Sequence, residues 1–331
     1  MFLNKMKIFI ITIFIFISCD ESKKENDLVE DIYGCIDERA TNYNSTANKS
    51  DGSCEYLGCT DSLAANYDSL ATTDDGNCLN IDQIPSGHEL YWNDEFNSDS
   101  LDNRFWNIEV LWPGAFNNES QSYTNSSENI LINNGNLYIR AKKENPFNPN
   151  QPGYTSGRIN TKNKVELKYG YWEIRAKLPS GVGTWPAIWM LGSKIDSIGW
   201  PNCGEIDIME HVGYDPDRVF FSIHNADFYG NVGGTAQQGI HYLSGIENDF
   251  HTYAVEWDST NIKGFIDGIL YFNYLRPTSS NYDNWPYDEP FFLILNLAIG
   301  GEWGGQQGID NSIFPASFII DYVRMFKKSN L

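Results

Sequence analysis

Between residues 89 and 328 the chain consists of short segments in which apolar and polar positions alternate, separated by Gly, Asn, Asp and Pro. Segments 136–142 and 171–178 show the alternation most clearly. The apolar face of the first holds Leu137, Ile139 and Ala141, and that of the second holds Trp172, Ile174, Ala176 and Leu178. A period of two is typical of β-strands that bury one face, so both segments are expected to be strands.

Other segments extend this pattern over the same region. Four more strands are expected at 220–224, 252–257, 262–267 and 317–326. The two-sided apolar run 291–298 fits a central strand that is covered on both faces. No segment shows the spacing of an amphipathic helix. Many strands and no helical pattern over about 240 residues predict a single all-β domain, a large sandwich or barrel.

The composition limits what such a domain can do. The 331 residues include 10 Trp, 19 Tyr and 19 Phe, which excludes a disordered, collagen-like or coiled-coil chain. There are 23 Lys and Arg against 44 Asp and Glu, so the net charge is −21. Nucleic acids and anionic membrane surfaces attract clustered Lys and Arg, and neither is expected as a partner. A neutral or cationic ligand is expected instead.

The first 18 residues have the features of an export signal. Lys5 and Lys7 precede an apolar run, 8–17, that is too short to span a membrane comfortably. Cys19 follows a small residue, as in the processing site of bacterial lipoproteins, and would become the lipidated N-terminus. The alternative is an ordinary cleaved signal followed by an unrelated Cys.

These features predict where the protein works. We expect an exported bacterial lipoprotein on the outer membrane or cell surface, or else a secreted protein. Residues 19–33 would be a linker, and the lipid would be the only contact with the membrane. Removal of residues 1–18 takes away two Lys and no acid, which changes the net charge from −21 to −23.

Four cysteines belong to an internal repeat at 34–80. Gly-Cys, Asn-Tyr, Asp-Gly and Cys landmarks of the first copy recur 24 residues later, which indicates a duplication. The two cysteines within each copy are 19 residues apart. The simplest disulfides are therefore Cys35–Cys54 and Cys59–Cys78, each closing a loop worth about 3 kcal/mol in the chain-entropy model.

The role of this repeat has two interpretations. Asp51, Asp74 and Asp75 lie beside glycines and could bind calcium. The pattern falls short of a full calcium loop, which favours a disulfide-bonded spacer. Residues 81–88 are expected to link the repeats to the β domain.

The candidate chemistry is concentrated in segment 204–211, where acids alternate with apolar residues. Like charges on one face of a strand repel each other and buried carboxylates are unfavourable, so this pattern is expected at a functional site. Glu205 and Asp207 share a face, whereas Glu210 would point the other way on a regular strand. One extra residue in a β-bulge near Ile208 and Met209 would return Glu210 to the shared face. A common site therefore requires a bulge there.

Two glutamates in this arrangement suit glycoside hydrolysis by double displacement. One carboxylate attacks the anomeric carbon while the other, its pKa raised by its neighbours, protonates the leaving oxygen; in such enzymes the carboxyls lie about 5–5.5 Å apart. Asp207 would hydrogen-bond a glutamate and tune its protonation. This chemistry needs no cofactor.

The segment resembles the Glu-x-Asp-x-x-Glu signature of glycoside hydrolase family 16, in the bulged form found in laminarinases and agarases. The resemblance extends over nearly all of residues 89–328. It includes a Trp-Pro-Ala-Ile-Trp-Met-Leu strand at 185–191, an Asn-Leu-Ala-Ile-Gly-Gly-Glu-Trp loop at 296–303, and shorter matches at 117–119, 123–124, 156–158 and 321–324. It implies that Glu205 is the nucleophile and Glu210 the acid/base. It also implies a jelly-roll β-sandwich of two curved antiparallel sheets whose concave sheet forms the sugar cleft.

By this resemblance we expect a monomeric endo-β-1,3-glucanase that cleaves neutral, laminarin-type β-glucans with retention of configuration. An agarase or other galactan hydrolase of the family is the closest alternative. A sulfated galactan fits less well because Arg158 and Lys162 are almost the only bases near the motifs. A non-catalytic cell-surface glucan-binding module is the alternative from another class, and the intact acids argue against it. Relatives also commonly hold a structural calcium, which would fall near Glu95, Gly135 and Asp321.

Six residues are candidates for sugar binding: Asn118, Arg158, Trp185, Trp189, His224 and Trp303. The three tryptophans could offer flat faces to pyranose rings, with packing in the sheet core as the alternative. Arg158 could hydrogen-bond hydroxyl groups or pair with an acid. His224 would be a cleft donor or a structural group.

Two residues near the acids are left out of the expected site. His211 follows Glu210 and should face away from it. Cys203 has no expected partner, so packing is favoured over reactivity.

Overall fold

The computed structural model of the chain describes residues 30–144, 153–230 and 235–329. The expected signal 1–18, Cys19 and most of the expected linker lie outside the described residues. Within these ranges no helix has both the length and the apolar character needed to cross a membrane. The chain divides into two compact units at the boundary between Cys54 and Glu55.

The first unit contains the first copy of the repeat. Strands β1 (Tyr33–Gly34) and β2 (Lys49–Ser50) pair in parallel, and a disulfide joins Cys35 to Cys54 with a Cα–Cα distance of 4.8 Å. The carboxylate of Asp51 accepts a hydrogen bond from the backbone N–H of Ser53, two residues further on (2.9 Å). This small fold has little apolar core and depends on its bridge.

The second copy repeats this structure within the second unit. Strands β3 (Leu57–Gly58) and β4 (Thr73–Asp74) pair in parallel, and Cys59 is bridged to Cys78 with a Cα–Cα distance of 4.9 Å. Both bridges are those that the spacing predicts. The carboxylates of Asp74 and Asp75 also accept backbone N–H groups two residues further on.

The second copy is attached to the β domain through a side-chain amide. Nδ2 of Asn97 donates to the carbonyl oxygen of Gly76 (2.9 Å) and to Oδ1 of Asn77 (3.0 Å). The expected linker contains a short 3-10 helix, η1 (Ile81–Gln83). The second copy therefore belongs with the β domain, and the first copy is a unit of its own.

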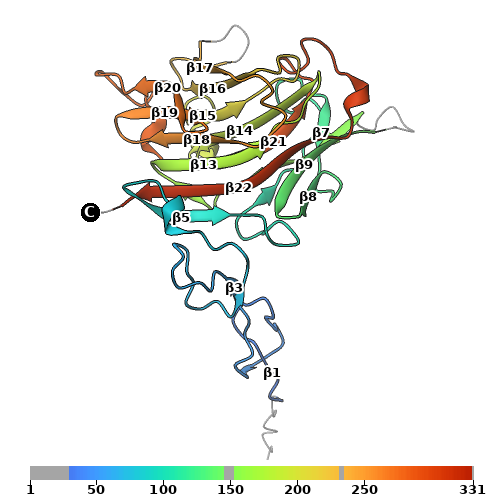
Figure 1. Cartoon of the computed structure of the whole chain (residues 1–331), viewed down its shortest axis with the longest axis vertical. Coiled ribbons are helices and arrows are strands. Elements are labelled where there is room, and N and C mark those ends of the chain that lie inside the picture. The colour runs from blue at the N-terminus through green and yellow to red at the C-terminus, as the bar shows by residue number, and fades with distance from the viewer. Residues whose placement is uncertain (1–29, 145–152, 231–234, 330–331) are drawn as a thin grey trace, which may run out of the picture. The chain divides into compact units, whose positions relative to one another are not determined.

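The β domain consists of two large sheets (Figure 1). The ten-stranded sheet runs in the order β20 (Ile269–Leu275), β19 (Asn261–Ile266), β18 (His251–Trp257), β13 (Gly170–Lys177), β22 (Ala316–Lys328), β9 (Asn136–Lys143), β10 (Tyr154–Ser156) and β7 (Gln121–Tyr123). Outside this path, β5 (His88–Asp94) pairs with β22 and β8 (Ile130–Asn133) with β9. All pairs in this sheet are antiparallel except β10 with β7.

The eight-stranded sheet is entirely antiparallel. Its order is β17 (Gln237–Tyr242), β16 (Arg218–His224), β15 (Glu205–Glu210), β14 (Thr184–Gly192), β21 (Phe291–Ile299), β11 (Arg158–Asn160) and β6 (Asn107–Ile108), and β12 (Glu166–Leu167) also pairs with β21. Helical structure in the rest of the β domain is limited to α1 (Ile195–Ile198), η2 (Pro286–Asp288) and η3 (Asn311–Ile313), as far as the described residues go. Each segment expected to be a strand is one.

The core lies between the two sheets and accounts for much of the aromatic content. Trp172 of β13 meets Trp257 of β18 at a ring distance of 5.7 Å, and Trp257 meets Phe291 of β21, in the other sheet, at 6.1 Å. All three rings are fully buried. Edge-to-face contacts of this kind add to the free energy gained by burying the rings. The all-β sandwich is confirmed.

The apolar run of β21 serves two different surfaces. Its odd-numbered residues, Phe291 to Ile299, face the core between the sheets. Its even-numbered residues, Phe292, Ile294, Asn296 and Ala298, line a cavity on the outer face of the eight-stranded sheet. A strand in this position needs apolar residues on both faces, which explains the absence of alternation.

Candidate active site

Strand β15 contains a β-bulge that organises the acidic residues. Between Asp207 and Glu210 two residues of β15 oppose one residue of β16, and the same extra residue shifts the pairing with β14. The side chains of Ile208 and Met209 are both buried in the core. Glu205, Asp207 and Glu210 all line the outer cavity. The bulge predicted near Ile208 and Met209 is therefore present, and it returns Glu210 to the shared face.

The cavity has a volume of about 900 Å³. Alternate residues of the central strands form its floor: Trp185, Ala187, Trp189 and Leu191 from β14, and Phe292, Ile294, Asn296 and Ala298 from β21. Its walls come from loops and include Phe116, Asn117, Glu119, Trp200, Tyr229 and Glu302. The size and the mixture of aromatic and polar groups are typical of a site for an organic ligand.

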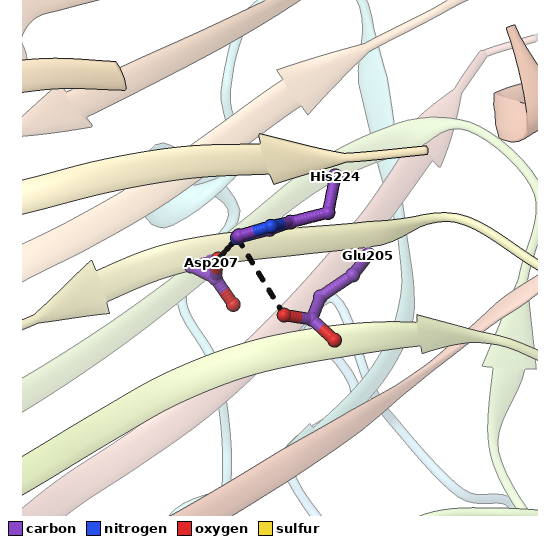
Figure 2. Close-up of side chains that lie close together, drawn as sticks. All are labelled: Glu205, Asp207 and His224. Atoms are coloured by element: carbon purple, nitrogen blue, oxygen red, sulfur yellow. Dashed lines mark hydrogen bonds and ion pairs between the residues drawn. The ribbon is translucent and has the colours of Figure 1, made fainter. Parts of the chain in front are cut away.

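His224 of β16 lies against two of the acids (Figure 2). Its Nε2 is 2.8 Å from Oδ2 of Asp207 and 3.6 Å from Oε1 of Glu205. Its Nδ1 accepts a hydrogen bond from the backbone N–H of Gly230 (3.2 Å). In the neutral imidazole the proton is therefore on Nε2, and this N–H donates a hydrogen bond to Asp207.

This tautomer bears on metal binding. Glu205, Asp207 and His224 offer ligand atoms that lie within 4.8 Å of one another, close enough to surround an ion. A metal would bind the lone pair of Nε2, but that nitrogen carries the proton. If the proton moved to Nδ1, the Nδ1–H would point at the N–H of Gly230, and the two hydrogens would repel each other. The three groups fit a hydrogen-bonded catalytic cluster better than a metal site.

The three acids are electrostatically coupled. Burial raises the pKa of Glu205, Asp207 and Glu210, each to about 8, because a buried carboxylate loses its hydration. The negative charge of Asp207 adds to the rise in pKa at both glutamates. The cluster therefore holds protons at a pH where exposed carboxyls have lost theirs.

Each glutamate also receives a hydrogen bond from an indole. Nε1 of Trp200 lies 2.9 Å from Oε2 of Glu205, and Nε1 of Trp185 lies 3.1 Å from Oε1 of Glu210. Both bonds favour the ionised carboxylate and lower the pKa against the effect of burial. Oε2 of Glu210 is buried and has no hydrogen-bond partner in the described part of the chain.

Arg158 is held between two rings and an acid. Its guanidinium carbon lies 4.9 Å from the ring centroids of both Phe116 and Trp189, and Nε lies 2.8 Å from Oε2 of Glu109. Arg158 is 7 % exposed and lines the cavity. Both expected roles, pairing with an acid and facing the cleft, are therefore combined in one side chain.

The three tryptophans expected in the cleft occupy different environments. Trp189 is half-buried and lines the cavity beside Arg158. Trp185 also lines it but is only 4 % exposed, so the indole serves Glu210 more than it offers a free face. Trp303 packs edge-on against Trp185 at 5.6 Å and is not among the lining residues.

The other two candidates lie just outside the cavity. His224 is 1 % exposed and reaches the site through Asp207. Asn118 donates to Glu302 (2.7 Å) and lines a smaller neighbouring pocket, whereas the adjacent Asn117 lines the main cavity.

The residues expected near a structural calcium meet where β22 changes partner from β9 to β5. Their carboxylates, however, are occupied by arginines. Arg324 donates two hydrogen bonds of 2.8 Å to Glu95, and Arg175 pairs with Asp321 at 2.5 Å. A calcium at this junction, held near Gly135 by backbone carbonyls and one carboxylate, would have to displace one of these arginines. The ion remains a prediction, to be tested by thermal melts with and without a chelator.

Several cavity residues could not be identified from the sequence. Trp200 and Tyr229 are loop residues, about half exposed, whose rings meet edge-on at 5.4 Å. Loop positions carry no periodicity, and the only signal for Trp200 was its place five residues before Glu205. Glu119 lies in a segment noted for its resemblance to the family, but nothing in the sequence places it in the cleft.

The two residues set aside are structural. His211 is buried and contacts the carbonyl oxygen of Arg218 (2.8 Å) and Oε1 of Glu247 (2.9 Å). Cys203 is fully buried against Leu191, and burial raises the pKa of its thiol to about 12. A thiol in this state packs as a small apolar group.

Known proteins resemble this chain in both sequence and structure. Residues 117–324 match the family described as glycosyl hydrolases family 16. A beta-glucanase from Rhodothermus marinus is 44 % identical over 247 residues, which cover 72 % of this chain and 85 % of the relative. A keratan-sulfate endo-1,4-beta-galactosidase from Sphingobacterium multivorum is 35 % identical, over 72 % of this chain and 55 % of the relative. The crystal structure of a laminarinase from Flavobacterium sp. UMI-01 superimposes with a TM-score of 0.66 at 44 % identity, over 72 % of this chain and 100 % of that one.

Proposed function

The chain belongs to glycosyl hydrolase family 16, and on this basis we propose that it hydrolyses internal β-1,3-glucosidic bonds of laminarin-type β-glucans with retention of configuration. The observation that carries the proposal is the bulge in β15. It places Glu205, Asp207 and Glu210 on one face of a cavity of about 900 Å³. Double displacement requires two carboxyl groups that can flank one glycosidic bond, and the bulge lets both glutamates reach the same cleft.

The first step forms a glycosyl-enzyme. A carboxylate oxygen of Glu205 attacks the anomeric carbon, and the bond from that carbon to the leaving oxygen breaks. The proton of Glu210 passes to the leaving oxygen, so the released sugar carries a hydroxyl. In the second step Glu210, now ionised, takes a proton from water, and the water oxygen displaces Glu205 from the anomeric carbon. Two inversions give net retention.

The surroundings of the two glutamates support these roles. Glu205 is the more exposed of the two glutamates, and it accepts the Trp200 N–H as Glu210 accepts that of Trp185. Glu210 is 6 % exposed, and its unpaired Oε2 is the oxygen free to carry and deliver a proton. Asp207 accepts a hydrogen bond from His224. Its charge adds to the rise that burial causes in the pKa of Glu210.

The charges around the cleft favour a neutral polysaccharide. Acids outnumber bases among the lining residues, and the two lining bases are already paired, Arg158 with Glu109 and Lys162 with Asp196. A sulfated chain such as keratan sulfate, the substrate named for the Sphingobacterium relative, would need unpaired cations. Charge does not separate a glucan from neutral agarose, so agarose belongs in the assay.

The test is release of reducing ends from laminarin, lichenan, agarose and keratan sulfate by the wild type and by Glu205→Gln. We expect laminarin to be cleaved fastest, with oligosaccharides as early products, and the variant to be inactive. Proton NMR of the fresh products should show the β-anomer first. Preferred cleavage of agarose would replace the glucanase by a galactan hydrolase. Binding of laminarin without cleavage of any polysaccharide would favour a glucan-binding module.

We also infer that the protein is an exported lipoprotein, anchored through Cys19 and monomeric. The support is the sequence of residues 1–19. Labelling of cells with a fatty-acid probe should mark the wild type and not Cys19→Ala, and the variant should leave the membrane fraction. Light scattering of the purified β domain with its repeats should give the mass of one chain.

A further inference from the structure

A chain of hydrogen bonds connects Trp189 and Glu119, two residues that line the cleft, through groups that lie behind its surface. Nε1 of Trp189 donates to Oδ1 of Asn296 (2.7 Å), and Nδ2 of Asn296 donates to the hydroxyl of Tyr123 (3.1 Å). The Tyr123 hydroxyl donates to Oε2 of Glu119 (2.9 Å). The four residues come from β14, β21, β7 and the loop that precedes β7. The chain therefore connects parts of the sequence that are far apart.

Only one arrangement of protons satisfies this chain. An indole N–H acts only as a hydrogen-bond donor, and an ionised carboxylate acts only as an acceptor. Oδ1 of Asn296 must therefore face Trp189, which leaves its Nδ2 facing Tyr123. The Tyr123 hydroxyl accepts a hydrogen bond from Asn296, so its own O–H must donate a hydrogen bond to Glu119. Each amide and hydroxyl group thus has a fixed orientation.

The Glu119 end of the chain is anchored to the backbone. Oε2 of Glu119 also accepts a hydrogen bond from Nε2 of Gln121 (2.7 Å). Oε1 of Gln121 in turn accepts the backbone N–H of Ile299 (2.7 Å). Glu119 and Gln121 are both buried. Because the anchor is rigid, the Tyr123 hydroxyl has a defined position relative to β21.

Tyr123 itself does not reach the cleft. Its side chain is 2 % exposed and is not among those that line the cavity, whereas Trp189 and Asn296 both line it. Trp189 also carries the guanidinium of Arg158 over its ring at 4.9 Å. The orientation of the Trp189 indole therefore determines where Arg158 and Asn296 lie in the cleft.

We propose that Tyr123 is a positioning residue for glucan binding, holding Asn296 and Trp189 in the orientation that the sugar chain contacts. The inference rests on the proposed function, because it assigns these two residues to substrate. Loss of the hydroxyl leaves the Asn296 amide without its acceptor and Trp189 without a fixed partner. Neither residue contacts the reacting carboxyls through this chain, so binding should change and the chemical step should not.

The test compares Tyr123→Phe with Tyr253→Phe. Tyr253 is a fully buried tyrosine whose hydroxyl has no hydrogen-bond partner among the described residues, so it is a matched control for removal of one buried oxygen. Tyr123→Phe should raise KM for laminarin oligosaccharides about 3- to 10-fold, the range for loss of a buried hydrogen bond, with kcat within about twofold of the wild type. Tyr253→Phe should change neither. An unchanged KM in Tyr123→Phe, or an equal rise in the control, would overturn the proposal.

A double-mutant cycle tests the route. In a Trp189→Phe background the indole donor is gone, so adding Tyr123→Phe should raise KM by less than twofold. Additive effects would show that Tyr123 acts by another route. Hydrolysis of laminarin by the wild type tests the proposed function separately. Titration calorimetry with laminarihexaose gives the same comparison as a Kd, without turnover.

A measurement on the wild type covers the case in which Tyr123→Phe does not fold. The Trp189 indole proton, assigned in NMR spectra by its absence from Trp189→Phe, should exchange with solvent at least 10-fold more slowly than that of Trp112, which is 82 % exposed. Equal exchange rates would mean that Trp189 is not held by Asn296 in solution, and the proposal would fail.

Discussion

The indole N–H of Trp200 donates a hydrogen bond of 2.9 Å to Oε2 of Glu205, from a loop outside the sheet to the residue proposed as nucleophile. The nucleophile must be ionised to attack, and this bond stabilises the ionised form. It opposes the rise in the pKa of Glu205 that burial and Asp207 cause. A loop residue therefore helps to set the pH at which the enzyme works.

Removal of this bond should move the acidic limb of the pH profile. In Trp200→Phe the pKa of Glu205 rises, and the acidic limb of kcat/KM should shift upward by roughly 0.5–1 pH unit. Activity should therefore fall about 3- to 10-fold on the acidic side and recover only as the pH rises past the pKa of Glu205. Trp112→Phe, which removes a highly exposed indole outside the cavity, is the control. An unshifted limb would mean that the bond does not tune Glu205.

The roles of the two glutamates can be separated by azide rescue. With an aryl β-glucan oligosaccharide that carries a good leaving group, Glu205→Ala plus azide should form the α-glycosyl azide, because azide attacks in place of the nucleophile. Glu210→Ala plus azide should form the β-glycosyl azide, because azide then attacks the glycosyl-enzyme. NMR of the products distinguishes them. The opposite pattern would exchange the two assignments.

Glu210 should make stability depend on pH in a defined direction. Its pKa is raised by burial to about 8, so between about pH 4.5 and 8 the folded protein holds a proton that the unfolded chain has lost. The stability this proton provides is present below pH 4.5 and is lost as the pH rises through 8. Glu210→Gln avoids that loss and should melt about 2–4 °C above the wild type at pH 8.5, with a smaller difference at pH 4.5. Thermal melts at both values check this, and an equal difference at both would contradict the buried-charge explanation.

Activity should depend on how many residues β15 contains as well as on which residues they are. Deletion of Met209 would remove the extra residue of the bulge and leave Glu210 at an even spacing from Glu205. Regular pairing would then keep Glu210 on the cavity face opposite Phe220, so measurable hydrolysis should remain and the β-sheet circular dichroism signal should be unchanged. Met209→Leu keeps the residue count and nearly the same volume, and should retain activity within a few fold. A deletion variant that folds but has lost all activity would show that the bulge does more than set the face of Glu210.

The sandwich and the acidic face could be predicted because each rests on local patterns. The alternation at 136–142 and 171–178 fixes which residues face the core, and the parity of 205, 207 and 210 requires the bulge that β15 contains. Cys35 and Cys54 are close in sequence, as are Cys59 and Cys78, so their pairing is the simplest one. Such features depend on neighbours along the chain.

The rest of the site depends on contacts between distant segments. The sequence predicts that Trp185 offers its ring face to sugar. In the structure the indole N–H of Trp185 donates a hydrogen bond to Glu210. The tautomer of His224 is set by Gly230, and the chain through Tyr123 joins residues 119 to 296. Glu95 and Asp321 were expected near calcium, and their arginine partners lie on other strands. None of these relationships has a periodicity that a sequence could display.

The buried thiol of Cys203 has a consequence for how the protein responds to redox conditions. It lies two residues before Glu205, and with its pKa at about 12 it presents no thiolate to an oxidant. The only other described cysteines are the four in the repeats, all of them bridged. A reductant should therefore open the disulfides of the repeats and leave Glu205 and Glu210 untouched. Among the described cysteines, those able to exchange disulfides lie in the repeats, so hydrolysis should not depend on the thiol–disulfide balance of the surroundings.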